Sequence, residues 1–276
     1  MPSTIPMSDA ASLDKLIAAV VENPRYAVIH PGLVARICTQ ELAKRRSTRD
    51  TVKAVRSRLH QIGGAYQETP IDYAQLAAEL DSLPADRGDP MLQGLCRKAL
   101  AQHASTRERL PLLERFFSET LASIAPIRSV LDLACGLTPL ALPWMPLANN
   151  STYAACDIYT DQMDFINAFF RHLYWPGEAF LCDLSCETPS RSAHLALLLK
   201  TIPCLEHLDK SIGSRLLAQI DAEHVLVSFP ARSLGGHARG MGKTYETRFH
   251  QLIAGQPWQI RRFEFSNELA FLLSRS

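Results

Sequence analysis

The second half of the chain alternates short apolar runs with longer helical stretches, and this alternation constrains the fold more than any other feature. Each of five runs is as long and as apolar as a buried strand, and polar or turn residues bound it. The runs lie at 129–133, 152–157, 179–183, 195–199 and 225–229. Helical patterns separate several of them, notably at 161–174 and 205–220. The alternation predicts an α/β fold with a parallel, doubly wound sheet.

The C-terminal tail departs from this alternation. Residues 259–273 contain two strand-like runs with a turn near Ser266 and Asn267, a pattern that predicts an antiparallel hairpin. Such a hairpin at the end of a parallel sheet is typical of Rossmann-like, class I methyltransferases, and most nicotinamide-binding folds lack it. We therefore expect a mostly parallel seven-stranded sheet that ends in a C-terminal antiparallel hairpin.

The first hundred residues follow a helical pattern, because their apolar residues recur at the spacing of one helix face. Helices are expected over 13–21, 33–42, 51–66, 73–80 and 91–103. Asp50 is a candidate N-cap for the third of these helices, which should end near Gly63. We assign residues 1–105 to an all-helical N-terminal domain and residues 106–276 to the α/β domain, and the length of the chain suffices for both.

The formal net charge of +1 conceals a strong asymmetry along the chain. Residues 1–60 hold ten Lys and Arg against five Asp and Glu, and residues 227–276 hold seven against three, whereas the segment between them is acidic. Within the basic stretch 44–58, Arg49, Lys53 and Arg56 fall on one side of a helix. This pattern predicts phosphate contacts with RNA, although a solvated helix exterior would look the same.

Composition excludes several other classes of protein. The chain contains no run of about 18 apolar residues, the length needed to span a bilayer, and its N-terminus lacks the basic start and apolar core of a secretion signal. We therefore expect a cytoplasmic protein without membrane contact, and nothing in the sequence demands more than a monomer. The seven cysteines are odd in number and have no paired spacing, which argues against a disulfide framework. Cys182 and Cys186 lack a second pair with which to bind zinc, and we expect no metal site.

Residues suited to an adenosine ligand follow three of the expected strands. In open α/β sheets ligands bind at the carboxyl ends of the strands, where a glycine lets the backbone approach them. Gly136 follows the first strand, and the chain lacks the G-x-G-x-x-G motif of dinucleotide folds. Asp157 ends the second strand, where two acceptor oxygens match a ribose diol, and Asp183 ends the third, where it could accept from an adenine amino group. Each acid could instead be a helix cap.

Six segments of the chain resemble the aminoglycoside-resistance 16S rRNA (guanine(1405)-N(7))-methyltransferases. They lie at 59–66, 103–110, 132–139, 198–206, 227–235 and 267–269. The most specific is His-Ala-Ser-Thr-Arg-Glu-Arg, which begins at His103. The chain departs from the family at Thr138, where the glycine turn usually has Asn, so any contact by an amide side chain is in doubt there.

The resemblance implies S-adenosylmethionine as cofactor and 16S rRNA within the 30S ribosomal subunit as substrate. Arg109 would pair with the methionine carboxylate of the cofactor, Asp157 would hold the ribose and Asp183 the adenine. The other implied cofactor-binding residues are His103, Asp132, Ala134, Gly136, Leu184 and Leu199. The positions linked in the family to target handling and activity are Lys200, Glu206, Met241 and Glu268.

Several of these positions also have a structural interpretation. Met241 could have a packing role alone, Glu268 could cap the hairpin turn, and Glu206 could be an acid at a helix N-terminus. Lys200 follows a buried strand, and a buried ammonium needs an acceptor. We expect this acceptor to be the guanine O6 or a phosphate of the substrate, with an ion pair to an acid such as Glu206 as the structural alternative.

The implied reaction needs few chemical groups. Guanine N7 carries an in-plane lone pair and no proton at neutral pH, so its attack on a sulfonium methyl needs no general base, and catalysis would consist of positioning. His60 and His103 are therefore expected to be structural. The target base would be extruded into a pocket, and the candidate stacking residues are Phe229, Tyr245 and Phe249, with core packing expected for at least one of them.

Two other functions remain open on the sequence alone. A methyltransferase for a small molecule would use the N-terminal helices as a lid, and its activity would survive neutralisation of the basic stretch. A non-catalytic RNA-binding relative would keep the fold and lose the cofactor, although Gly136, Asp157, Asp183 and Arg109 all speak against such a loss.

Overall fold

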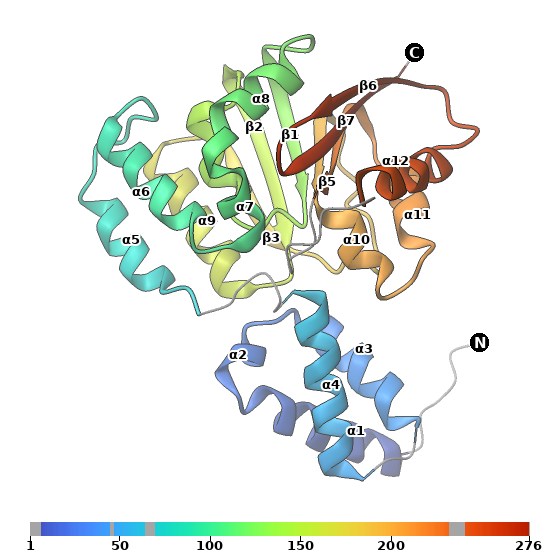
Figure 1. The fold of residues 1–276 in the computed structure, drawn as a ribbon. Coiled ribbons are helices and arrows are strands. Elements are labelled where there is room, and N and C mark those ends of the chain that lie inside the picture. Colours follow the sequence, from blue (N-terminus) through green and yellow to red (C-terminus); the bar gives the residue numbers. More distant parts are fainter. Residues whose placement is uncertain (1–6, 45–46, 64–69, 232–240, 276) are drawn as a thin grey trace.

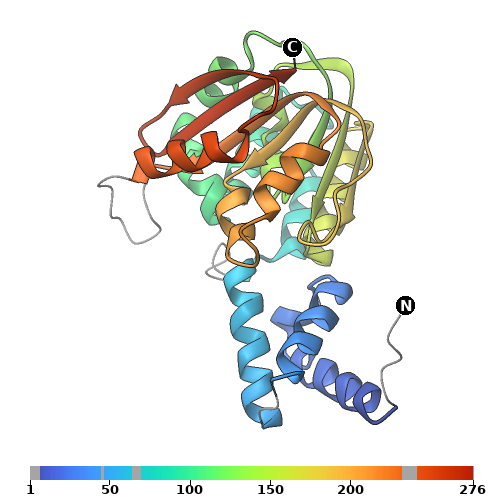
Figure 2. The same cartoon turned by 90° about the vertical axis from the view of Figure 1, so that its right-hand side faces the viewer.

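The computed structural model describes residues 7–44, 47–63, 70–231 and 241–275, which form a helical bundle and a larger body built on one sheet (Figure 1). The bundle lies against the edge of the sheet at which the central strands end, and a second view shows the same arrangement (Figure 2). Among the helices of the described ranges, none has the length and apolar character needed to cross a bilayer.

Seven strands form the sheet in the order β3-β2-β1-β4-β5-β7-β6. They are β1 (Ile127–Leu133), β2 (Leu147–Asp157), β3 (Gly177–Leu181), β4 (Ala193–Leu199), β5 (Ala222–Pro230), β6 (Trp258–Glu264) and β7 (Glu268–Arg275). The first five are parallel, and β7 is antiparallel to both β5 and β6. This topology confirms the predicted parallel sheet with its C-terminal hairpin, and its order reverses beside β1, where such folds bind ligands.

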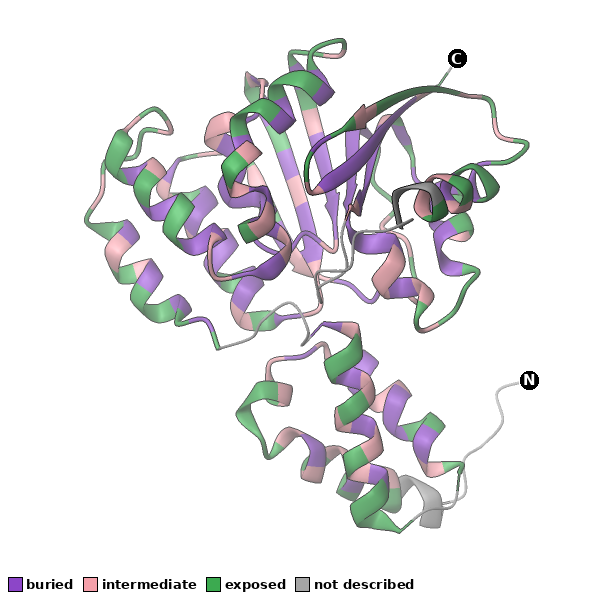
Figure 3. Cartoon of the chain, in the orientation of Figure 1, coloured by how far each residue is buried: buried purple, intermediate pink, exposed green. Residues whose placement is uncertain are grey.

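Alternate residues of the central strands face two apolar cores, because successive side chains of a strand point to opposite faces. On β4, Leu195 and Leu197 enter one core, and Ala196 and Leu198 enter the other. The first core is covered by α5 (Tyr73–Asp81), α6 (Pro90–Leu100), α8 (Leu113–Leu121) and α9 (Thr160–His172). The second is covered by α10 (Thr201–Glu206), α11 (Ile212–Gln219) and α12 (Met241–Leu252). Burial on both faces explains why these strands are continuous apolar runs (Figure 3).

The helical bundle has a core of its own. The bundle consists of α1 (Met7–Val21), α2 (Pro24–Ala27), α3 (Pro31–Leu42) and α4 (Thr48–Ile62). Its buried residues include Leu16, Val20, Leu33, Ile37, Val55 and Leu59. Ser47, not Asp50, caps α4, since its hydroxyl accepts from the backbone N–H of Asp50, and the helix ends at Gly63 as predicted.

Several predicted boundaries differ in the structure. Helices α5 and α6 pack in the first core of the sheet, whereas α1 to α4 form the core of the bundle. The change from one core to the other therefore lies between α4 and α5, whereas the domain boundary was predicted near residue 105. The helix expected over 91–103 ends at Leu100 and is followed by α7 (Ala104–Arg109), and the one expected over 205–220 is divided into α10 and α11. Helical periodicity identifies an apolar face, but it does not say which core that face enters.

Candidate active site

A pocket opens at the carboxyl ends of β1 to β4, on the side that faces the helical bundle. It encloses about 690 Å³, part of it open to solvent. The predicted site residues that line it are His103, Ala134, Gly136, Asp157, Asp183, Leu184, Leu199 and Lys200. A concave site with apolar walls and a few convergent polar groups is the usual form of a small-molecule site. Two predicted cofactor residues, Arg109 and Asp132, do not line it.

The turn after β1 needs a glycine at position 136. Its φ is +51°, in the left-handed region, and a Cβ there would lie 3.0 Å from a ring carbon of His103. The backbone N–H of Gly136 donates to Asp157 Oδ2 over 2.8 Å, and Gln162 Nε2 donates to its carbonyl over 3.0 Å. The turn is therefore fixed from both sides, with its backbone at the pocket wall.

Asp157 is oriented by backbone donors. Its Oδ1 accepts from the N–H of Ile158 over 2.7 Å, in addition to the Gly136 bond to Oδ2. Burial raises the pKa of this carboxyl group above its ordinary value, and the two backbone hydrogen bonds oppose the rise. Each carboxylate oxygen has a second lone pair, so Asp157 can still accept from two hydroxyl groups in the pocket.

Asp183 lies in the loop beyond β3, which ends two residues earlier than predicted. Its Oδ1 accepts from the N–H and hydroxyl of Ser185 over 3.1 and 2.5 Å, and its Oδ2 accepts from Arg36 Nη2 over 2.7 Å. Burial alone would raise the pKa of Asp183, but the hydrogen bonds from Ser185 and Arg36 and the charge of Arg36 outweigh it and lower the pKa. Arg36 comes from α3, and no sequence pattern pointed to it.

Arg109 lies behind the pocket and is bound to Glu268. Its Nε and Nη2 donate to the two carboxylate oxygens over 3.0 and 2.6 Å, and both side chains are at most 2% exposed. Burial would raise the pKa of Glu268, but the charges of Arg109 and Lys200 outweigh it and lower the pKa. Arg109 Nη1 takes part in neither bond, so a contact with a cofactor carboxylate remains a prediction for this group. Glu268 is an ion-pair partner and not merely a turn cap.

Asp132 is also buried behind the pocket, within β1. The hydroxyl of Tyr153 donates to its Oδ2 over 2.8 Å. Burial raises the pKa of Asp132 to about 8, although the Tyr153 bond and the charge of Arg109 oppose this. Asp132 therefore supports the end of β1, and we expect no direct contact between its side chain and a ligand.

Lys200 lines the pocket but is almost fully buried, and it already has acceptors. Its Nζ donates to Glu108 Oε2 over 2.6 Å and to the carbonyl of Ser105 over 3.2 Å, and Glu268 Oε2 is 3.6 Å away. The expectation that its acceptors arrive only with a substrate was wrong, and the structural alternative, an ion pair to an acid, is confirmed with Glu108 in place of Glu206. We call Lys200, Glu108, Arg109 and Glu268 the buried charge cluster.

Glu206 and Met241 lie on helices outside this cluster. Glu206 ends α10, so it is not an acid at a helix N-terminus, and it accepts from Arg248 Nη2 of α12 over 2.6 Å. Met241 begins α12, but its side chain lies outside the described residues.

Most of the predicted aromatic stacking residues belong to the core. Phe229 and Phe249 are 1% and 0% exposed, and Phe249 stacks on Phe271 with ring centres 4.0 Å apart. Tyr245 is half-buried and stacks on Phe229, so of the three it alone reaches the surface. Their side chains fill the space between β5, β7 and α12, which sequence alone does not reveal.

His103 is buried, and its pKa is lowered to about 4 by burial and by the charges of Lys200, Arg107 and Arg109. A ring that stays neutral and exchanges a hydrogen bond with Ser105 Oγ over 3.0 Å agrees with the structural role expected for it.

The basic residues of α4 divide into two kinds. Arg49 and Lys53 are exposed, and with Arg56 they line a hollow between α1 and α4 that also contains Glu22. Arg56 Nη2 donates to the carbonyls of Ala19 and Val20 over 2.7 and 3.2 Å. Arg56 therefore holds the end of α1 against α4, so the predicted phosphate contact has a structural alternative at this residue.

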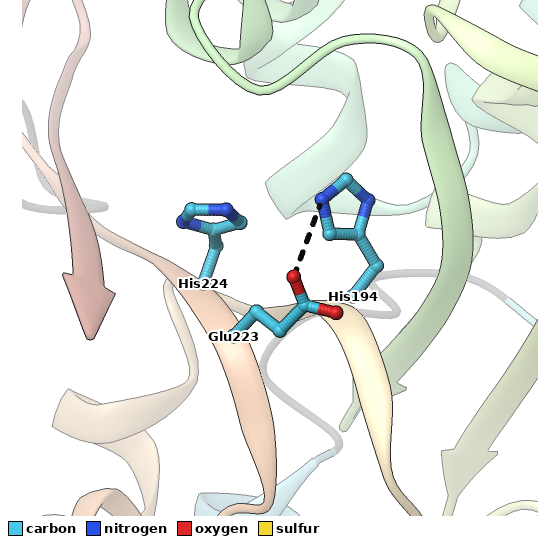
Figure 4. Close-up of side chains that lie close together, drawn as sticks. All are labelled: His194, Glu223 and His224. Carbon is cyan, nitrogen blue, oxygen red and sulfur yellow. Dashed lines mark ion pairs between the residues drawn. The ribbon is translucent and has the colours of Figure 1, made fainter. Parts of the chain in front are cut away.

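A second group of titratable side chains lies at the opposite edge of the sheet, where β4 and β5 begin: His194, Glu223 and His224 (Figure 4). The backbone N–H of Arg128 donates to His194 Nδ1 over 3.2 Å, so the neutral ring carries its proton on Nε2, the atom nearest Glu223 at 4.0 Å. Arg128 also balances Glu223 through a 2.6 Å ion pair. These bonds would have to break for the group to hold a metal, and we assign none to it.

Comparisons with known proteins agree with this geometry. The family model described as "Ribosomal RNA methyltransferase (FmrO)" matches residues 22–272. A 16S rRNA (guanine(1405)-N(7))-methyltransferase of Micromonospora echinospora is 33% identical, over 95% of this chain and 97% of its own length. One from Serratia marcescens is 35% identical, over 96% and 99%. The crystal structure of the 16S rRNA methyltransferase RmtF with S-adenosyl-L-homocysteine has a TM-score of 0.81 at 33% identity, over 99% and 100% of the two chains. This chain belongs to the FmrO family of ribosomal RNA methyltransferases.

Proposed function

We propose that this protein transfers a methyl group from S-adenosylmethionine to N7 of guanine 1405 in 16S rRNA, in the decoding site formed by helix 44, and so confers aminoglycoside resistance. The observation that carries the proposal is the pocket at the carboxyl ends of β1 to β4, in a chain similar over nearly its whole length to enzymes named for this reaction. We further propose that the substrate is the 30S subunit and that the protein acts in the cytoplasm as a monomer.

The pocket suits an adenosine. Asp157 presents two oriented oxygens for the ribose hydroxyls, Asp183 offers an acceptor for the adenine amino group, and apolar walls such as Leu184 and Ile158 suit the flat faces of the base. We assign the cofactor carboxylate to Arg109 Nη1, the guanidinium nitrogen that takes part in neither hydrogen bond to Glu268. The cofactor supplies an electrophilic methyl group on a sulfonium sulfur.

The protein's own contribution would be positioning, since guanine N7 has no proton to remove. Holding nucleophile and methyl group in line is worth about 7 to 11 kcal/mol in well-oriented reactions. Lys200 is the cation of the cluster that lines the pocket, and Glu108 and Glu268 hold its ammonium in place. A cation fixed in this way can attract the guanine O6, and it would give up no proton in doing so.

The helical bundle would dock the ribosomal substrate through Arg49 and Lys53, whose exposed charges can replace counterions on RNA phosphates. The competing function is a small-molecule methyltransferase with the bundle as its lid. The two functions separate when Arg49 and Lys53 are replaced by Glu, because only ribosome methylation would then fail.

The proposal is tested by mapping methyl groups on 16S rRNA from cells that express the protein. Primer extension and mass mapping should locate one new methyl group, at N7 of guanine 1405. Asp157→Ala should abolish it and weaken S-adenosylmethionine binding in calorimetry by about 1.5 to 3 kcal/mol, because a charged hydrogen-bond partner is removed. Asp164→Ala, an exposed acid of α9, is the matched control. Unmodified guanine 1405 would refute the proposed reaction, and unchanged affinity in Asp157→Ala would refute the assignment of this residue to the cofactor.

A further inference from the structure

The helical bundle is joined to the body directly beside the pocket. The N–H of His30 donates to the carbonyl of Ile158 over 2.7 Å, and the N–H of Thr160 donates to the carbonyl of Val28 over 2.8 Å. These bonds flank Tyr159, a residue of the body whose side chain packs in the core of the bundle. The junction therefore begins one residue after Asp157.

The end of α4 forms part of the pocket wall. Ile62 and Gly63 line the pocket, and a Cβ at Gly63 would collide with the ring and hydroxyl of Tyr159. Glycine at position 63 thus permits the end of α4 to approach the body closely. The bundle is thus a structural part of the pocket as well as a candidate docking surface.

Arg36 connects this bundle to the carboxylate at the far end of the pocket. Its Nη2 donates to Asp183 Oδ2 over 2.7 Å and to Ser185 Oγ over 2.5 Å, and Ser185 in turn donates to Asp183 Oδ1. The side chains of Arg36 and Asp183 are 26% and 9% exposed, so the pair is screened from water more than a surface pair would be. Both carboxylate oxygens are consequently held by donors, one of which comes from a different part of the fold.

We propose that Arg36 is a positioning residue that holds Asp183 oriented toward the adenine amino group, so that the docked bundle determines how well the pocket selects adenine. This inference rests on the proposed assignment of Asp183 to adenine. Without Arg36, Asp183 loses the donor on Oδ2 and can turn with Ser185, so the lone pair of Oδ2 that faces the ligand is no longer held in a fixed direction.

The test compares two ligands that differ at the position in question. S-adenosyl-L-homocysteine carries the 6-amino group, and S-inosyl-L-homocysteine has a carbonyl there, which a carboxylate repels. The wild-type protein should bind the adenosyl compound at least about tenfold more tightly, because a site built to receive an N–H rejects an analogue without it. Arg36→Ala should reduce this ratio at least about threefold, whereas a merely structural role would weaken both ligands equally and leave the ratio unchanged.

Two further variants complete the experiment. Arg58→Ala removes another arginine of the bundle, one that pairs with the buried Glu41 away from the pocket, and it should keep the wild-type ratio. In an Asp183→Asn background, Arg36→Ala should have no additional effect on the ratio. An unchanged ratio in Arg36→Ala, or an equal effect in the Asp183→Asn background, overturns the proposal. Absence of any S-adenosyl-L-homocysteine binding in the wild type would instead overturn the proposed function, and an unchanged ratio in Asp183→Asn alone would overturn the assignment of that residue.

Discussion

Charged side chains serve different purposes in the helical bundle and in the body. Arg49 and Lys53 of α4 are exposed, so their charges are hydrated and contribute little to stability. In the buried charge cluster, Lys200, Arg109 and Glu268 are each at most 4% exposed, and every charge is held by an opposite one. Exposed cations can be exchanged without unfolding the protein, whereas any change in the cluster affects stability together with activity.

The largest expected effect is that of breaking the cluster. Glu268→Gln keeps the shape of the side chain but leaves Arg109 and Lys200 with one carboxylate, Glu108, between them. Removal of one partner from a buried ion pair typically costs about 3 to 5 kcal/mol, and we expect a decrease of that size in the free energy of urea unfolding. Glu119→Gln, in an exposed pair with Arg115, should change stability by less than about 0.5 kcal/mol. Equal free energies of unfolding for the two variants would contradict the difference between buried and exposed ion pairs.

A second buried carboxyl group, Asp132, should reveal itself through pH. Its pKa is raised from 3.8 to about 8 by burial, so between these values the folded protein keeps a proton that the unfolded chain releases. Stability then falls as the pH rises through this window, by at most about 1.4 kcal/mol per pH unit, and levels off above it. In Asp132→Asn this contribution is absent. Unfolding free energies of both proteins at pH 5 and pH 8 measure it, and parallel values would rule it out.

The sheet could be predicted from the sequence because its signal is local. Strands buried on both faces are apolar throughout, and a turn near Ser266 and Asn267 separates the two strand-like runs of the tail, so the strands and the hairpin stand out in a single pass along the chain. The limits of the helical bundle could not be predicted in this way. The apolar faces of α5 and α6 have the same periodicity as those of α1 and α3, and only the folded chain shows that they pack on the sheet.

The residues of the site show the same difference between local and long-range signals. Gly136, Asp157 and Asp183 could be found because the end of a parallel strand is a position that sequence reveals. Arg36 could not, because it meets its partner across 147 residues and lies in no recognised motif. Glu108 lies within His-Ala-Ser-Thr-Arg-Glu-Arg, but the motif does not reveal its partner, which is 92 residues away. The aromatic residues show a different limit: core packing is expected for at least one of the three rings and is found for Phe229 and Phe249, but composition does not say which rings are buried.

The smallest expected effects on stability separate the basic residues of α4 from one another. Arg49→Glu with Lys53→Glu should leave the free energy of unfolding within about 0.5 kcal/mol of the wild type, because both side chains are exposed. Binding to 30S subunits should weaken, and the log-log dependence of affinity on salt should flatten by about 0.7 to 0.9 for each RNA phosphate that the variant no longer neutralises. Lys98→Glu reverses one cation on the surface of α6, away from the bundle, and should leave the slope unaltered.

Arg56 should behave in the opposite way, since its guanidinium is bound to the carbonyls at the end of α1. Arg56→Ala should cost about 1 to 3 kcal/mol of stability, the range for hydrogen bonds made by a charged donor, and the salt dependence of 30S binding should stay that of the wild type. Urea unfolding and filter binding at several salt concentrations give both quantities for the same samples. A flattened slope with unchanged stability in Arg56→Ala would place this residue with Arg49 and Lys53 as a phosphate-binding cation, and its bonds to α1 would then be dispensable.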